Sequence, residues 1–111
     1  MKTPNNKIKS LGILFSKIAK EQGNKIAINF GEKKYSFKYL DDLSNKYFLL
    51  FKKMNLKENN TVAIESNKNI HSYALLISCL KSGVIYSFFS KSEPKHRLLK
   101  IIKRIKPKII F

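Results

Sequence analysis

The apolar and polar positions of this 111-residue chain change period in an order typical of a layered α/β domain. From Ile70 to Leu80 almost every residue is apolar, which predicts a helix that neighbouring elements cover on most sides. Gly83 ends this helix, and the continuous apolar run from Val84 to Phe89 is typical of a strand buried on both faces of a parallel sheet. We therefore place this helix and strand at the centre of the fold.

A polar, basic lead-in of residues 1–10 precedes the first predicted element, and we expect it to be flexible because it is terminal. Five apolar residues then recur at helical spacing and predict an amphipathic helix with one buried face: Leu11, Leu14, Phe15, Ile18 and Ala19. Ser10 is the predicted N-cap of this helix, and Gly23 is its predicted stop.

A hairpin and a second helix are predicted next. Ile26, Ile28 and Phe30 alternate with their neighbours and share one face of a strand, and Gly31-Glu32 predicts a type II′ turn into a second strand at 33–37. Ser36 can cap the following helix. We expect the core-facing stripe of that helix to consist of Leu40, Leu43, Tyr47, Leu50, Phe51 and Met54.

From Thr61 onward the pattern alternates between strand and helix. Strands are predicted at 61–65, 84–89 and 108–111, with helices at 69–82 and 94–106. Such alternation predicts one parallel sheet with right-handed crossovers. The expected fold class is α/β, the N-terminal part of a layered parallel-sheet subdomain, preceded by a helix and a short β-hairpin. Because the final strand needs neighbours, we expect residues 11–111 to be an incomplete domain that breaks off inside its own sheet.

The ends of the two crossover helices carry their own signals. The helix at 69–82 can take its cap from Ser66, Asn67 or Asn69, and Pro94 fits the first turn of the last helix. The apolar stripe of that last helix is predicted to be Leu98, Ile101, Ile102 and Ile105.

The strong positive charge of the chain raises the possibility that it binds an anionic partner. The formal net charge is +16, from 23 Lys and Arg against 7 Asp and Glu, and such an excess attracts nucleic acid, anionic lipid or acidic proteins. Arg97 and Arg104 are the only arginines, however, and lysine is the less specific phosphate ligand. Lys100, Lys103 and Arg104 share the outer face of the last helix. We expect this face to be solvated, and weak non-specific binding of nucleic acid or another anion is the alternative.

The sequence shows no constellation of catalytic residues. Its four glycines are dispersed in turn-like places and form no phosphate loop, and His71 and His96 lack the Cys or carboxylate neighbours of a metal site. We expect Asp41 and Asp42 to interact with a helix dipole rather than to act as an acid/base pair. Cys79 is predicted to be a small buried side chain rather than a reactive thiol. The prediction is therefore no catalytic, cofactor-binding or metal-binding residue in this chain.

Two further absences bear on location. No apolar run approaches the roughly 20 residues of a membrane span, and the first residues lack a signal-like apolar region. We expect a cytoplasmic protein without a membrane span.

Four short segments, in this order and spacing, resemble motifs of a known family. The stretch 35–40 (YSFKYL) is similar to a Ser/Thr–aromatic opening motif, with Tyr39 where that motif has Glu. The stretch 80–86 (LKSGVIY) resembles Leu-Lys-Ala-Gly-x-x-Tyr, although 87–91 (SFFSK) departs from the Val-Pro-Leu and Asp/Asn-Pro that follow it there. Pro94 with 97–98, and Lys-Pro-Lys at 106–108, complete the pattern. Together the segments resemble the start of an adenylate-forming (AMP-binding) enzyme, the superfamily of acyl-CoA synthetases, peptide-synthetase adenylation domains and luciferases.

The resemblance covers residues 11–111 and implies the N-terminal fragment of a longer ligase. Family members activate a carboxylic acid with ATP and Mg²⁺ to an acyl-adenylate, and usually pass the acyl group on to a thiol. Their phosphate loop, ribose-binding Asp and catalytic Lys lie downstream of this region, so none is carried onto a residue here. ATP and Mg²⁺ are implied for the parent family only, and a downstream polypeptide with the rest of the ligase is the implied partner.

We expect this chain to be inactive alone. Two alternatives stay open at this point: a small basic interaction module, and a scaffold or assembly partner of a split ligase.

Overall fold

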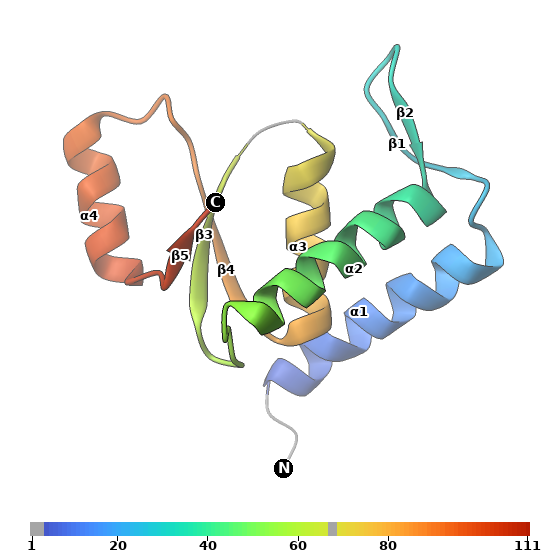
Figure 1. The fold of residues 1–111 in the computed structure, drawn as a ribbon. Helices are drawn as coiled ribbons and strands as arrows, with labels where there is room; N and C mark the ends of the chain where they lie inside the picture. Colours follow the sequence, from blue (N-terminus) through green and yellow to red (C-terminus); the bar gives the residue numbers. More distant parts are fainter. Residues whose placement is uncertain (1–3, 67–68) are drawn as a thin grey trace.

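The computed structural model describes residues 4–66 and 69–111, with side chains from residue 10 onward. The elements in chain order are α1 (Pro4–Glu21), β1 (Ile26–Asn29), β2 (Lys34–Ser36), α2 (Phe37–Lys53), β3 (Thr61–Glu65), α3 (Ile70–Ser82), β4 (Ile85–Phe89), α4 (Lys95–Ile105) and β5 (Ile109–Ile110). Figure 1 shows the sheet between α4 on one side and the three helices α1 to α3 on the other, with the hairpin β1–β2 at the far end of α2. The predicted α/β fold class and the predicted order of elements are confirmed.

The described residues of β3, β4 and β5 form a parallel sheet in the order β4-β3-β5. Thr61 pairs with Ile85 at one end of the β3–β4 ladder, and Val62 pairs with Ile109 of β5. The crossover through α3 runs from β3 to β4, and the crossover through α4 runs back past β3 to β5. Helices α3 and α4 lie on opposite faces of the sheet, as Figure 1 shows, which is what two crossovers of the same hand in opposite directions produce. The prediction of a parallel sheet with two helical crossovers is confirmed.

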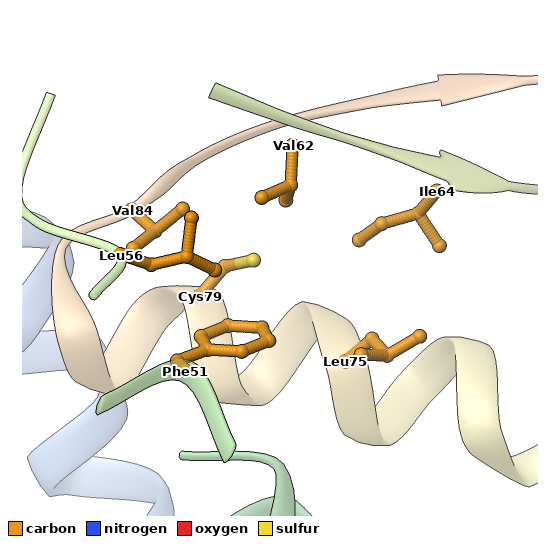
Figure 2. Packing of buried hydrophobic residues seen from close by; sticks show 7 residues of the cluster. All are labelled: Phe51, Leu56, Val62, Ile64, Leu75, Cys79 and Val84. Atoms are coloured by element: carbon orange, nitrogen blue, oxygen red, sulfur yellow. The ribbon is translucent and has the colours of Figure 1, made fainter. Parts of the chain in front are cut away.

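The main core lies between the sheet and helices α2 and α3. Figure 2 shows Val62 and Ile64 of β3 directed toward α3, where they meet Leu75 and Cys79. Each of these four side chains is less than 9% exposed, and burying a large aliphatic side chain stabilises a fold by about 1.5–3 kcal/mol. The cluster is completed by Phe51, Leu56 and Val84.

A second cluster covers the other sides of α3. It joins Ile70, Ala74 and Ile77 of α3 to Leu40 of α2, with side chains of α1 and of the hairpin packed against it. The prediction that α3 is covered on most sides is therefore confirmed.

Local signals set the ends of the helices where the sequence predicts them. Ser36 and Asn69 each accept a hydrogen bond from the backbone N–H three residues later, at 3.0 Å in both cases. Asn69 is thus the cap of α3; Asn67, another candidate, lies outside the described residues. Gly83 has a left-handed backbone (φ 76°, ψ 12°), and Gly31 has φ 84° in the hairpin turn. Both values lie in the region that side chains with a Cβ avoid.

Helix α1 departs from the prediction. It begins at Pro4, so it already covers residues 4–10 and Ser10 is not its N-cap. Proline suits a first helical turn, because the N–H that it lacks has no partner there. The buried face also differs, since Ala19 is 5% exposed whereas Leu11 and Leu14 are 54% and 51% exposed.

Gly12 explains this rotation of α1. The residue lies in mid-helix and not in a turn, and an added Cβ would stand 2.7 Å from the backbone N and Cα of Lys81. Helices α1 and α3 therefore touch almost backbone to backbone. Because only glycine fits this crossing, it determines which face of α1 points inward.

The first strand of the hairpin is irregular. Ile26 pairs with Ser36 and Ile28 pairs with Tyr35, so Ala27 is an extra residue, as in a β-bulge. Ala27 and Ile28 both pack inward, whereas Ile26 is 52% exposed. This bulge interrupts the regular alternation that the sequence predicts for Ile26, Ile28 and Phe30.

Strand β4 is not buried on both faces, contrary to the prediction. Ile85, Tyr86 and Phe88 are 41%, 36% and 42% exposed. The reason is position: within the described sheet β4 is an outer strand with β3 as its neighbour. We call these three residues the β4 edge.

The predicted apolar stripes of α2 and α4 are also less buried than expected. In α2 the buried residues are Leu40, Ser44 and Phe51, whereas Leu50 is 39% exposed. Helix α4, all of it described, has no fully buried residue, and its predicted stripe is half-buried. Pro94 occupies the N-cap position just before α4 and not its first turn.

Candidate functional site

Three helices meet at Lys81, in the last turn of α3. Its Nζ lies 2.6 Å from Asp41 Oδ1 and also donates to Ser44 Oγ at 2.8 Å and to Asn45 Oδ1 at 2.7 Å, all on α2. An ammonium group has three N–H donors, so each of them has an acceptor here. The side chains of Lys81 and Asp41 are only 9% and 15% exposed, which shields the ion pair from solvent. We call this group the three-helix junction.

Helix α1 contributes to the same junction. Ser16 Oγ donates to Asp41 Oδ1 at 3.2 Å, and the Phe15 ring lies 5.9 Å from Lys81 Nζ, within the range of a cation–π contact. The prediction that Asp41 serves the helix dipole is wrong, because Asp41 lies beyond the first turn of α2 and its partner is Lys81. Asp42 is exposed.

The three-helix junction ties α1, α2 and α3 together. Every N–H of Lys81 is engaged, and Asp41 Oδ1 accepts two hydrogen bonds. Lys81 stands two residues before the left-handed Gly83, so the junction sets where α3 ends and where β4 begins. The sequence analysis quoted Lys81 only as part of a motif. The sequence signal for this junction was a lysine within a mostly apolar helix. Such a lysine indicates a buried partner but does not identify it.

A hollow of ≈ 690 Å³ lies beside the junction, between the end of α1, the loop that follows it and α2. Its charged side chains are three carboxylates and three lysines: Glu21, Asp41, Asp42, Lys20, Lys25 and Lys38. The three carboxylates offset the three lysines, so the hollow has no excess of positive charge to attract a triphosphate. The hollow is therefore a poor site for a nucleotide.

The positions of the glycines also argue against a nucleotide site. Gly12 lies within α1, Gly23 follows α1, Gly31 is in the hairpin turn and Gly83 ends α3. A phosphate loop needs several backbone N–H groups that converge from neighbouring residues. The residues that the structure describes do not fit ATP.

The cysteine and the two histidines do not gather into a reactive cluster in the described part of the chain. Cys79 is fully buried, and burial raises the pKa of its thiol to about 12, so the predicted role as a small core residue is confirmed. His71 lies in the first turn of α3 as predicted, with Nδ1 2.9 Å from Tyr47 Oη, and burial raises the pKa of that phenol. His96 is exposed on α4. Over residues 4–66 and 69–111, no three His, Cys, Asp or Glu side chains gather as a metal site would require.

The outer face of α4 is basic, as the sequence predicts. Lys100, Lys103 and Arg104 are all exposed.

Every helix among the described residues is too short or too polar to cross a membrane.

A family model described as AMP-binding enzyme matches residues 15–111. The chain belongs to the AMP-binding enzyme family. The matched range contains all four segments through which the sequence resembles adenylate-forming enzymes, and it confirms that resemblance. None of the curated proteins matches the sequence.

Several solved structures share the fold. The N-terminal subdomain of NpsA from Klebsiella oxytoca is 14% identical, with a TM-score of 0.82 over 90% of this chain and 26% of that one. VinN in complex with 3-methylaspartate is 14% identical, with a TM-score of 0.82 over 89% of this chain and 28% of that one. IdnL1 is 19% identical, with a TM-score of 0.80 over 89% of this chain and 20% of that one. The AMP-binding chain described here thus spans 20% to 28% of the length of these proteins.

Proposed function

We propose that this chain is the N-terminal part of an AMP-dependent ligase that activates a carboxylic acid with ATP to an acyl-adenylate and then forms a thioester. The observation that carries the proposal is the family match over residues 15–111, in a fold shared with NpsA and VinN. The chain spans about a quarter of such proteins, which supports a larger enzyme of which this chain is one part. A cytoplasmic location, expected from the sequence, belongs to the same proposal.

The ligands of the same neighbours support a proposal for the substrate class. VinN has been solved with 3-methylaspartate and with L-aspartate, and NpsA with 3-hydroxyanthranilyl-AMSN and 3-hydroxybenzoyl-AMSN. These ligands derive from carboxylic acids, which supports a carboxylic acid as the substrate of the complete enzyme. The particular acid is set by a pocket that we expect outside this chain.

The chain alone is proposed to be inactive, with no catalytic, cofactor-binding or metal-binding residue of its own. Adenylate formation requires a carboxylate held in line with the α-phosphate while the developing charge is neutralised. The dispersed glycines and the carboxylates Glu21, Asp41 and Asp42 of the hollow beside the three-helix junction support inactivity. The β4 edge supports a partner as well, because covering exposed apolar surface stabilises an interface by roughly 25 cal/mol per Å².

The two alternatives, a basic nucleic-acid-binding module and a scaffold of a split ligase, have no comparable support. The exposure of Lys100, Lys103 and Arg104 is equally expected of a solvated face, so it does not favour a nucleic-acid-binding module. A scaffold of a split ligase would use the same β4 edge, and the assay below separates it from a catalytic half.

Pyrophosphate release with a panel of carboxylic acids tests the proposal, on the chain alone and together with the polypeptide encoded downstream. We expect turnover only with the second polypeptide, and we expect Phe88→Lys to abolish this complementation while Lys103→Ala leaves it intact. Turnover by the chain alone, after rigorous removal of contaminating ligases, would overturn the proposal. Binding of the second polypeptide without turnover would assign the chain to the scaffold alternative.

A further inference from the structure

Both arginines of the sequence lie on α4, and with Lys100 they line one hollow of ≈ 300 Å³. Arg97, Lys100 and Arg104 stand at i, i+3 and i+7, which puts them on one ridge of the helix along about 10 Å at 1.5 Å per residue. Ile101 and Ile105, both half-buried, form the apolar side of the hollow. We call this feature the α4 groove.

Little counter-charge balances the α4 groove. From Pro94 to Phe111 the sequence has seven Lys or Arg and no Asp or Glu. Arg97 pairs with Glu93, with Nη1 3.4 Å from Oε2 and the Arg97 side chain 67% exposed, and such exposed pairs are weak. In the described part of the chain no ion pair forms at Lys100 or Arg104. Like charges at this spacing destabilise a helix, so the ridge is a cost to α4 unless an anionic partner neutralises it.

We propose that the α4 groove docks an acidic amphipathic helix of a partner protein. Guanidinium groups bind carboxylates through paired N–H donors, and two of the three cations are arginines. A helix with Glu or Asp one turn apart repeats at the spacing of the cationic ridge. The aliphatic side formed by Ile101 and Ile105 can receive an apolar side chain of the same acidic helix. This surface does not depend on the proposed ligase function.

Two other anionic partners fit less well. Single-stranded nucleic acid binds through aromatic stacking beside its charge, and α4 has no Phe, Tyr or Trp. A bilayer needs an exposed apolar face on the helix, and on α4 only Leu99, 55% exposed, is a strongly exposed large apolar side chain. An acidic helix uses both the cations and the aliphatic wall.

A labelled synthetic helix tests the proposal by fluorescence anisotropy with the full chain at physiological salt. The probe carries glutamates at i, i+3 and i+7 with leucines beside them. Replacing Arg97, Lys100 and Arg104 together by alanine is expected to weaken binding about tenfold, since each exposed pair contributes little alone. A matched control replaces the exposed lysines Lys46, Lys53 and Lys57 by alanine and removes the same charge from elsewhere. We expect this control to weaken binding less than about twofold.

Circular dichroism and thermal melting establish that both triple variants fold. A third variant, Ile105→Ser, keeps every charge and is expected to weaken the same probe, because it removes the apolar contact. Equal losses in the two triple variants would overturn the proposal in favour of general charge attraction. So would the absence of saturable binding, or tighter binding of phosphatidylserine vesicles or of oligo-dT than of the acidic helix.

Discussion

Replacing Gly12 by alanine tests the crossing of α1 and α3. The added Cβ would lie 2.7 Å from both the N and the Cα of Lys81 and 2.9 Å from the carbonyl carbon of Leu80. Carbon atoms in favourable contact stand about 3.5–4.0 Å apart, so the two backbones have to separate by about 1 Å. Because these are backbone atoms, no side chain can rotate to relieve the contact.

Two effects of opposite sign decide the outcome. Alanine is the better helix former by about 1 kcal/mol, and in an open mid-helix position Gly12→Ala would stabilise the protein by that amount. Overpacking costs about 1–3 kcal/mol, and separation of the helices also draws Ser16 and Phe15 away from the ion pair of Lys81. We expect a net loss of about 1–2 kcal/mol, or roughly 4–8 °C in Tm for a domain of this size.

Urea and thermal denaturation measure the sign directly. Gly31→Ala is the matched control, since its Cβ would meet nothing within 4 Å while its φ of +84° strains any residue other than glycine. That control should lose about 1–2 kcal/mol through backbone strain alone, and its effect should add to that of Gly12→Ala. A rise in stability on Gly12→Ala would refute the backbone-to-backbone contact between α1 and α3.

Three further changes test other parts of the structure. Lys81→Met leaves the carboxylate of Asp41 buried without its partner, and we expect it to lower the free energy of unfolding in urea by about 3 kcal/mol. Adding Asp41→Asn to this variant should restore part of that stability, and no restoration would contradict the pairing of Lys81 with Asp41. Burial raises the pKa of the Cys79 thiol to about 12, well above that of a thiol in the unfolded chain. Above about pH 9 the unfolded chain loses this proton while the folded chain keeps it, so the stability of the protein should fall by about 1.4 kcal/mol per pH unit. The difference in stability between the protein and Cys79→Ala should therefore narrow above about pH 9, and a constant difference would contradict this. We expect the exposed apolar side chains of the β4 edge to make the isolated chain self-associate. Ile85→Lys and Phe88→Lys should each reduce that association in sedimentation while changing stability by less than about 0.5 kcal/mol, and unchanged association would show that the β4 edge does not mediate it.

The features that sequence predicted well depend on neighbouring residues. Strand β3 forms at its predicted bounds, and Ser36, Asn69 and Gly83 act at the helix ends where their side chain or missing Cβ is needed. Each of these signals works over a few residues and needs no knowledge of the fold.

The features that sequence missed depend on contacts between distant elements. The inward face of α1 is set by the Gly12 crossing with α3, which hydrophobic spacing does not register. The acceptors of Lys81 come from another helix, and nothing in the α3 segment identifies Asp41 as the partner. The exposure of β4 reflects its place at the outside of the described sheet, whereas its apolar sequence predicted neighbours on both faces.

The strand order also determines when each edge of β3 is paired during translation. β3 meets β4 after one crossover, but its other edge is paired only when Ile109 reaches Val62. A ribosome that adds about 5–20 residues per second needs about 1–4 s for the roughly twenty residues between β4 and β5. Helices form within about a microsecond, so the first half of the sheet is complete long before β5 emerges. For those seconds the backbone of β3 offers an open edge to any neighbouring nascent chain, and this is the interval in which a chaperone has most to protect.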